Sequence, residues 1–226
     1  MRKFIIANWK CNPVTLASAK KLFISVQKGL KNAENSQVII CPPFVYLEEL
    51  LKLRKKLKLG AQDCYWQEKG AFTGEISAVM LKNLECKYVI LGHSERKAQE
   101  TDKLVNQKIK SALKSGLEVI LCIETISQLK HRLKGISKNN IEKILIAYEP
   151  PGAISTSGGK IPSNSHIIEK LKEIKKITNT FILYGGSVDS SNIERFMKLG
   201  FNGALVGAAS LKAKEFIGIV QAVEDI

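Results

Sequence analysis

The sequence repeats one pattern along its whole length, a short apolar segment followed by a segment of helical periodicity. The apolar segments are rich in β-branched residues and alternate little between apolar and polar positions, which is typical of strands buried on both faces of a parallel sheet. Eight such segments are expected as strands: Phe4–Trp9, Val38–Cys41, Leu57–Gln62, Tyr88–Gly92, Val119–Ile123, Ile144–Tyr148, Phe181–Tyr184 and Ala204–Val206.

The segments between them carry apolar residues at helical spacing. One stripe comprises Leu16, Ala19, Phe23, Val26 and Leu30. A second comprises Ile167, Ile168, Leu171, Ile174 and Ile177, and Pro162-Ser163 before it is a plausible helix start.

Eight parallel strands joined by helices favour a closed (β/α)₈ barrel. No linker or change of composition divides the chain, so residues 1–226 are expected to form a single catalytic domain. The competing architecture is an open doubly wound sheet, which usually has a G-x-G-x-x-G turn after its first strand. Here the first strand is followed by "NWKCN", so that signal is missing.

Composition narrows the class of protein further. No apolar run approaches the roughly 20 residues of a membrane helix, and "MRKFIIANWKCN" lacks the long apolar region of a signal peptide. The five cysteines are odd in number, spread widely and lack C-x-x-C spacing, which argues against a disulfide framework and a zinc site. We therefore expect a cytoplasmic protein without a membrane or metal partner.

The net charge of +14 allows three kinds of anionic partner: nucleic acid, a membrane surface or a small substrate. The lysines are scattered through the expected helices, as in "KLRKKLKLG", and no aromatic residues interleave them as stacking partners. This distribution favours a solvated basic surface over a nucleic-acid interface.

Polar residues and bare glycine loops follow the expected strands where a barrel enzyme holds its chemistry, at the carboxyl ends. Small residues after strands seven and eight are typical of a phosphate-binding cup made from backbone N–H groups. A glutamate, a histidine and a lysine on the same rim fit proton abstraction next to a carbonyl group. The residues at these positions are Asn8, Lys10, His93, Ser94, Glu95, Glu149, Gly185, Gly186, Ser187, Gly207 and Ala208.

Each of these residues taken alone has a simpler interpretation. Glu149 is a solvated loop acid, Lys10 a surface lysine, His93 a structural histidine and "YGGS" a turn. Their position on one predicted rim favours the catalytic interpretation, because scattered surface residues would fall on both ends of the barrel.

Seven motifs together resemble the triosephosphate isomerase family, in order and over nearly the whole chain. They are "NWK" (8–10), "AQD" (61–63), "GAFTGEIS" (70–77), "LGHSER" (91–96), "AYEP" (147–150), "YGGSV" (184–188) and "LVGAASL" (205–211). The resemblance implies interconversion of dihydroxyacetone phosphate and D-glyceraldehyde 3-phosphate through an enediolate, in glycolysis and gluconeogenesis.

The resemblance also implies residue roles. Glu149 is similar to the base that moves the proton, His93 to the neutral imidazole electrophile, and Lys10 to the fixed cation. Asn8 would orient the substrate and Lys10. Ser94 and Glu95 would support the site, although Glu95 is alternatively structural.

For binding and assembly, the resemblance implies a phosphate held by backbone N–H groups of Ser155, Ser187, Gly207 and Ala208, and no cofactor. Thr73, at the tip of "GAFTGEIS", would reach into a second subunit, which implies a homodimer; an ordinary loop is the alternative. The small residues after Glu149 would form a lid that excludes water.

The chain departs from the family in three places. Pro151-Gly152 replaces an apolar residue and a tryptophan after "EP". Ser155 and Ala208 replace glycines, and a positive φ at either would be strained. "CIET" (122–125) lacks a glycine and the stretch after it is short, so a shortened helix 5 region is expected.

Three other functions remain open from the sequence. Another phosphate-binding barrel isomerase or synthase would share the cup, although it would not need "NWK", "HSER" and "AYEP" together. A basic nucleic-acid-binding protein would show steeply salt-dependent binding. The third is a triosephosphate isomerase slowed by its altered lid.

Overall fold

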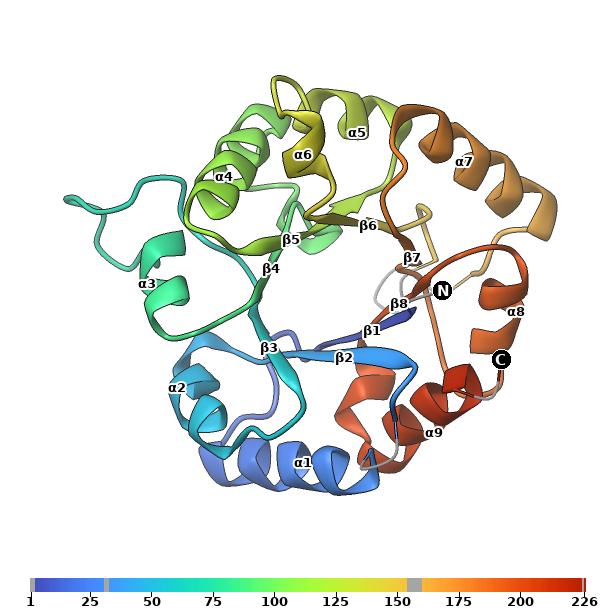
Figure 1. Cartoon of the computed structure of the whole chain (residues 1–226), viewed down its shortest axis with the longest axis horizontal. Helices are drawn as coiled ribbons and strands as arrows, with labels where there is room; N and C mark the ends of the chain where they lie inside the picture. The colour runs from blue at the N-terminus through green and yellow to red at the C-terminus, as the bar shows by residue number, and fades with distance from the viewer. Residues whose placement is uncertain (1–2, 31–32, 154–159, 225) are drawn as a thin grey trace.

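The fold is a closed eight-stranded barrel inside a ring of helices (Figure 1). It comes from a computed structural model, which describes residues 3–30, 33–153, 160–224 and 226. The strands follow one another around the barrel in chain order, and β8 pairs with β1 to close it. Every pairing is parallel, so the predicted (β/α)₈ barrel is confirmed and the doubly wound sheet is excluded.

The eight strands coincide with the eight apolar segments to within two residues at each end. They are β1 (Lys3–Asn8), β2 (Ser36–Cys41), β3 (Lys58–Ala61), β4 (Tyr88–Leu91), β5 (Glu118–Ile123), β6 (Ile144–Tyr148), β7 (Ile182–Tyr184) and β8 (Gly203–Val206).

The helices surround the strands. They are α1 (Leu16–Gly29), α2 (Phe44–Leu53), α3 (Ala78–Asn83), α4 (Asp102–Lys114), α5 (Ile126–Arg132), α6 (Lys138–Ile141), α7 (Asn164–Ile177), α8 (Ile193–Lys198) and α9 (Ala213–Glu224). Two short 3₁₀ helices, η1 (Ser94–Arg96) and η3 (Ala208–Leu211), lie within three residues of the ends of β4 and β8.

The predicted apolar stripes face the barrel, with exceptions at their edges. Ala19, Phe23 and Val26 of α1 are buried, whereas Leu16 in its first turn is 37% exposed. In α7 the buried positions are Ile167, Leu171 and Ile174. The predicted start of α7 is also confirmed, because the Ser163 side chain caps it by accepting the N–H of His166.

Helix 5 is present, although residues 124–143 form only short helices. Thr125 starts α5 with a capping box, in which the side chain of Gln128 accepts the backbone N–H of Thr125. The chain turns at Gly135, where φ is +70°, and continues into the single turn of α6. The predicted shortening is therefore accommodated by a helix of seven residues that still covers the barrel.

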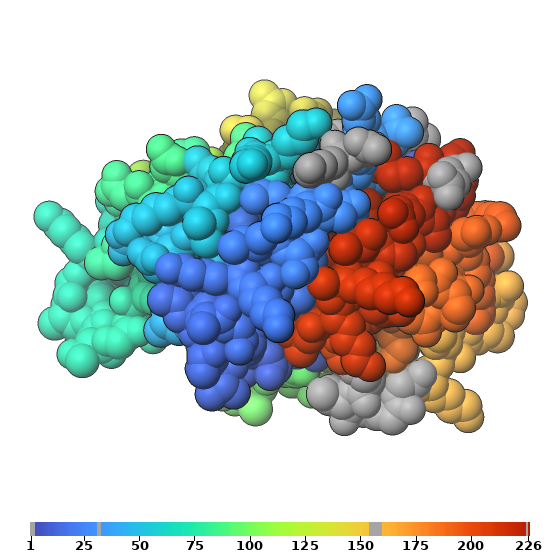
Figure 2. Space-filling model, turned by 90° about the horizontal axis from the view of Figure 1, so that it is seen from below, coloured from blue at the N-terminus to red at the C-terminus, as the bar shows by residue number. Residues whose placement is uncertain are grey.

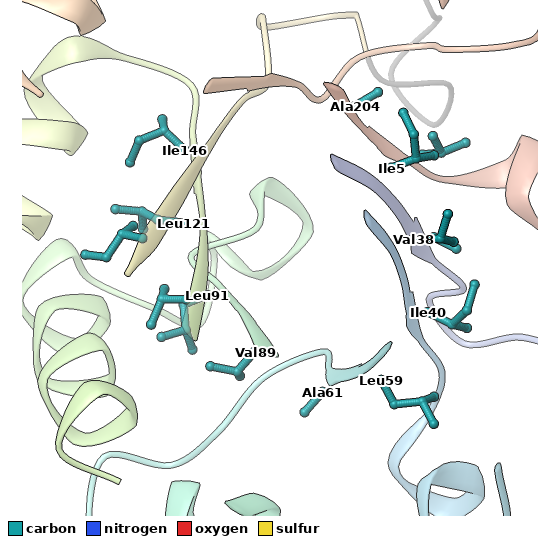
Figure 3. Packing of buried hydrophobic residues seen from close by; sticks show 14 of the residues in the cluster. Ile5, Val38, Ile40, Leu59, Ala61, Val89, Leu91, Leu121, Ile146 and Ala204 are labelled. Carbon is teal, nitrogen blue, oxygen red and sulfur yellow. The ribbon is translucent and has the colours of Figure 1, made fainter. Parts of the chain in front are cut away.

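Side chains leave the strands in both directions, which explains their unbroken apolar character. Figure 3 shows residues such as Ile5, Leu91 and Leu121 pointing outward from the strands toward the helices. A second buried cluster fills the barrel interior: Phe4, Ile6, Ile39, Cys41, Tyr88, Ile90, Ile120, Cys122, Leu145, Ala147, Leu183 and Leu205. The barrel is thus a packed core and holds its site only at one end.

The loop between β3 and α3 projects away from the barrel (Figure 1), and the same turquoise segment extends from the body in Figure 2. Its base is closed by the N–H of Tyr65, which donates to the Ile76 carbonyl. Within it, Tyr65 packs on Phe72 with ring centroids 4.8 Å apart. Among the described residues, none of the helices combines the length and apolarity that crossing a membrane requires.

Candidate active site

A pocket of about 100 Å³ opens at the carboxyl ends of the strands. The predicted base, electrophile, cation and phosphate loops all line this one pocket, so the structure brings together residues from five strand ends. The lining residues are Asn8, Lys10, His93, Glu149, Gly185, Gly186, Ser187, Val188, Asp189, Leu205, Gly207, Ala208 and Ala209.

Glu149 directly follows β6 and is 1% exposed. Its backbone N–H donates to the Ile123 carbonyl at 2.8 Å, which extends the β5–β6 pairing by one residue. Its Oε2 accepts the backbone N–H of Ser94 at 3.0 Å. Its Oε1 is buried and accepts no hydrogen bond from the described residues.

His93 caps η1 and is 7% exposed. Its Nδ1 accepts the backbone N–H of Glu95 at 3.1 Å. A ring nitrogen that accepts a hydrogen bond carries no proton, so the neutral ring has its hydrogen on Nε2. That Nε2 lies 3.1 Å from Oε1 of Glu149.

Lys10 has a left-handed backbone with φ of +53°, which is unusual for a residue with a side chain. Two contacts hold this conformation. The Lys10 N–H donates to Oδ1 of Asn8 at 3.0 Å, and the Gln62 side-chain amide donates to the Lys10 carbonyl at 2.9 Å. The lysine is thereby bent into the pocket.

The ammonium of Lys10 pairs with the carboxylate of Glu95, with Nζ and Oε1 2.5 Å apart. The Lys10 side chain also passes the loop after β8, since a Cβ added to Gly207 would lie 3.5 Å from Cε and 3.8 Å from Nζ. A positive charge thus stands between the carboxyl end of β1 and the predicted phosphate cup.

The predicted phosphate cup comprises the loops after β7 and β8, which line the pocket. Ala208 starts η3, and it is not among the described residues with positive φ, so the strain expected there is absent. Both the N–H and the hydroxyl of Ser187 donate to the Ala153 carbonyl, at 2.8 and 2.9 Å. The Ser187 N–H therefore has to leave Ala153 before it can bind a phosphate. Ser155, the fourth predicted donor, lies outside the described residues.

The two residues that flank the predicted lid, Gly152 and Lys160, lie next to each other. The Gly152 carbonyl accepts the N–H of Lys160 at 3.1 Å, so the two ends of the segment 153–159 meet. Gly152 has φ of +78°, a conformation that glycine adopts without the strain of a side chain. The chain thus turns sharply two residues after Pro150.

Three residues near the site were not singled out from the sequence. Gln62 was quoted only within "AQD", yet it holds the Lys10 backbone. Cys122, inside the barrel, has its thiol pKa raised well above the usual value by burial and then by the Glu149 carboxylate. Arg132, in the shortened helix, bonds the backbone next to His93. Their contacts to the site could not be anticipated from the sequence, because each is made to a residue distant along the chain.

Among the described residues, no group of three histidine, cysteine or acidic side chains is arranged to hold a metal ion. The described chain does assemble a carboxylate, an imidazole, an ammonium and a backbone cup around one pocket. These are the parts of a (β/α)₈-barrel enzyme that moves protons on a phosphorylated substrate.

Comparison with known proteins narrows this class. The family model described as triosephosphate isomerase matches residues 3–223. The chain is 41% identical over 249 residues to triosephosphate isomerase of Dictyoglomus thermophilum, covering 97% of this chain and 99% of that protein. It is 43% identical over 251 residues to the enzyme of Dehalococcoides mccartyi, covering 97% and 96%.

The solved structure of triosephosphate isomerase from Bartonella henselae superposes with a TM-score of 0.86 at 30% identity, covering 99% of both chains. The chain therefore belongs to the triosephosphate isomerase family. The predicted family, barrel fold and reaction are confirmed: the chain is an aldose–ketose isomerase of dihydroxyacetone phosphate and D-glyceraldehyde 3-phosphate, and the glycolytic role follows from the family.

Proposed function

We propose that Glu149 is the base and His93 the electrophile of this isomerisation. The observation that carries the proposal is the proximity of the two side chains in the pocket wall, where Oε1 of Glu149 accepts no hydrogen bond from the described residues and lies 3.1 Å from Nε2 of His93. The carboxylate removes a proton from one substrate carbon and returns it to the neighbouring carbon. The Nε2–H of His93 donates to the substrate oxygens as their charge develops.

Lys10 supplies a fixed cation for the enediolate and the phosphate, and Asn8 and Gln62 hold its backbone. Ser94 and Glu95 support the site through the Ser94 N–H on Glu149 and the Glu95 carboxylate on Lys10. The backbone N–H groups of Ser187, Gly207 and Ala208 bind the phosphate, and Ser155 is proposed as the fourth donor.

The active form is a homodimer in which the loop of Thr73 inserts beside the site of a partner. Thr73 is exposed and belongs to the projecting loop between β3 and α3. A hollow of about 190 Å³ next to the pocket includes Lys10, His93 and Glu95 in its wall and offers a place for such a loop. Exposed apolar side chains at Val14 (88%) and Val45 (79%) would be covered by a second subunit.

Residues 1–226 act as one catalytic domain, and the protein works in the cytoplasm. The location is supported by the cysteines, which are all free, with four of the five buried. The substrate is a small phosphorylated triose, and the proposal includes neither a cofactor nor a nucleic acid.

A coupled assay of glyceraldehyde 3-phosphate conversion tests the proposal. Lys10→Met should lose most activity, since the only cation seen in the pocket lining of the described residues is removed. Lys20→Met is the matched control, because Lys20 pairs with Glu49 on the surface. Full activity of Lys10→Met would exclude the proposed role of this residue.

A further inference from the structure

Arg132, the last residue of α5, places its guanidinium beneath the catalytic rim. Its side chain is 4% exposed. One nitrogen, Nη1, donates to the Gly92 carbonyl at 3.0 Å and to the Cys122 carbonyl at 2.6 Å. A second, Nε, donates to Oδ1 of Asp102 at 2.8 Å, so the buried charge is paired.

One carbonyl lies at the end of β4, which carries the proposed electrophile, and the other lies in β5, the strand that pairs with β6 beside the proposed base. Gly92 directly precedes His93, so fixing its carbonyl fixes the peptide plane from which the imidazole projects. Cys122 is paired in register with Ala147, and the next residue, Ile123, accepts the N–H of Glu149. One side chain thus joins the end of β4 to the end of β5.

Residue 92 has to be a glycine for Arg132 to approach the backbone this closely. Gly92 has φ of +68°, and an added Cβ would lie 2.6 Å from Nη1 of Arg132 and 3.1 Å from Val105. The guanidinium therefore packs directly on the backbone, with no room for another side chain between them.

We propose that Arg132 is a positioning residue for the isomerisation: it holds His93 and Glu149 at their working separation by tying the end of β4, which carries His93, to the end of β5, where Ile123 accepts the N–H of Glu149. It is not part of the pocket lining and acts through those residues. The inference rests on the proposed roles of His93 and Glu149. Lysine cannot replace it fully, because a single ammonium does not reproduce the planar fork that meets three acceptors here.

The test compares Arg132→Met and Arg132→Lys with the wild-type chain. Displacement of catalytic groups on the 1 Å scale costs about 100-fold in rate, so Arg132→Met should lower kcat by about that factor, with Arg132→Lys between the two. KM should change much less, since the partners of Arg132 among the described residues are Asp102, Gly92 and Cys122, none of which belongs to the loops after β7 and β8. The kcat is expressed per active site, titrated with a tight-binding phosphohydroxamate mimic of the enediolate.

Asp102→Ala provides a milder variant if Arg132→Met folds poorly. Asp102 pairs with Arg132, and its side chain is 33% exposed, so its loss frees the guanidinium without emptying the core. Its kcat should fall by several-fold while KM stays close to wild type.

A purely structural role is distinguished by imidazole ¹⁵N resonances of labelled histidine. The His93 signals should shift in the Arg132 variants, because Nδ1 accepts from Glu95 only when the ring is correctly placed. His166 on the exposed side of α7 is the internal reference. Val220→Ala in α9 is the matched control, since it destabilises a buried position remote from Arg132.

Three results separate failure of this inference from failure of the proposed function. If His93→Gln is inactive while Arg132→Met and Asp102→Ala keep wild-type kcat and His93 resonances, the positioning role is wrong. The positioning role is also wrong if Val220→Ala, at the same melting temperature as Arg132→Met, loses as much kcat and the His93 resonances of Arg132→Met do not shift. If His93→Gln is itself fully active, the proposed role of His93 fails.

Discussion

Glu149 illustrates how much of the site depends on backbone brought in from other strands. The carboxylate is fixed by an N–H of the segment after β4, and its own N–H is fixed by a carbonyl of β5. On the β7 side, the Gly185 N–H donates to the carbonyl of Tyr148 at 2.8 Å. Three neighbouring segments therefore determine where one carboxylate lies.

Glu149→Asp should test this placement most directly. The substitution keeps the charge but withdraws the carboxylate by about one bond length, and misplacement on this scale costs about 100-fold. We expect kcat to fall by that order with KM little changed in the coupled assay. Glu142→Asp, at an exposed position before the same strand, should have wild-type kinetics. An unaffected kcat in Glu149→Asp would remove this residue from the mechanism.

Gly185→Ala should disturb the same carboxylate without changing it chemically. The new Cβ would lie 2.8 Å from Cγ of Glu149, closer than real Cβ atoms approach a neighbour, and 3.2 Å from the Tyr148 carbonyl oxygen, which is tight but possible. The side chain of Glu149 has to move, so kcat should fall by about 100-fold. Gly218→Ala in α9 serves as the control, because its Cβ would only touch Ser190 at 3.2 Å. Equal activities of the two variants would contradict the expectation.

At the scale of elements, a buried ionic cluster holds α4 against the segments after β3 and β4. Lys108 of α4 donates to both oxygens of Asp63, at 2.9 and 2.8 Å, and to Glu100 at 2.7 Å. Arg96 of η1 pairs with the same two acids. Burial raises the pKa of Glu100, but hydrogen bonds from Lys108 and Arg96 outweigh it and hold that pKa below its usual value.

Lys108→Met should therefore be strongly destabilising. Removing one member of a buried ion pair leaves its partners uncompensated and costs about 3–5 kcal/mol. Urea unfolding of the variant should show a loss of this size. The matched control is Lys114→Met in the same helix, whose lysine pairs with Glu68 on the exposed surface and should contribute little. Equal stability of Lys108→Met and wild type would contradict the ionic account of this cluster.

The cluster also predicts a pH dependence. Because the folded pKa of Glu100 lies below the usual 4.5, its ionised form stabilises the fold above that pH, and the contribution is lost as the pH falls through the folded pKa. The free energy of unfolding of Glu100→Gln should thus be lower than wild type at pH 7, and the difference should shrink in acid. A difference that grows as the pH falls would reverse the sign and refute the assignment.

At the scale of the whole molecule, the proposed dimer depends on insertion of the projecting loop of Thr73 into the partner subunit. A charge placed at its tip would be buried without a partner, so Thr73→Arg should yield weakly active monomers in sedimentation velocity and activity measurements. Asn139→Arg, on exposed α6, introduces the same charge elsewhere and should leave the dimer intact. A wild-type chain that sediments as a fully active monomer at nanomolar concentration would rule out the dimer.

The sequence by itself determined the barrel fold and which residues lie at the carboxyl ends of its strands. Eight apolar segments without alternation specify strands buried on both faces, and the parallel connections through helices place every strand end at one rim. Glu149, His93 and Lys10 could be singled out as candidates in this way because each lies within two residues of the end of its strand. The start of α7 was equally readable, since the capping signal at Ser163 is local in the chain.

Only the tertiary structure decided how those residues are held. The left-handed backbone of Lys10 depends on Gln62, which approaches from β3, and the engagement of Ser187 by Ala153 joins two loops distant in sequence. The sequence also did not reveal that the shortened α5 contacts the site, through the hydrogen bonds of Arg132 to the carbonyls of Gly92 and Cys122. Local sequence patterns indicate secondary-structure propensity and burial. These contacts instead arise from packing between segments that are far apart in the sequence.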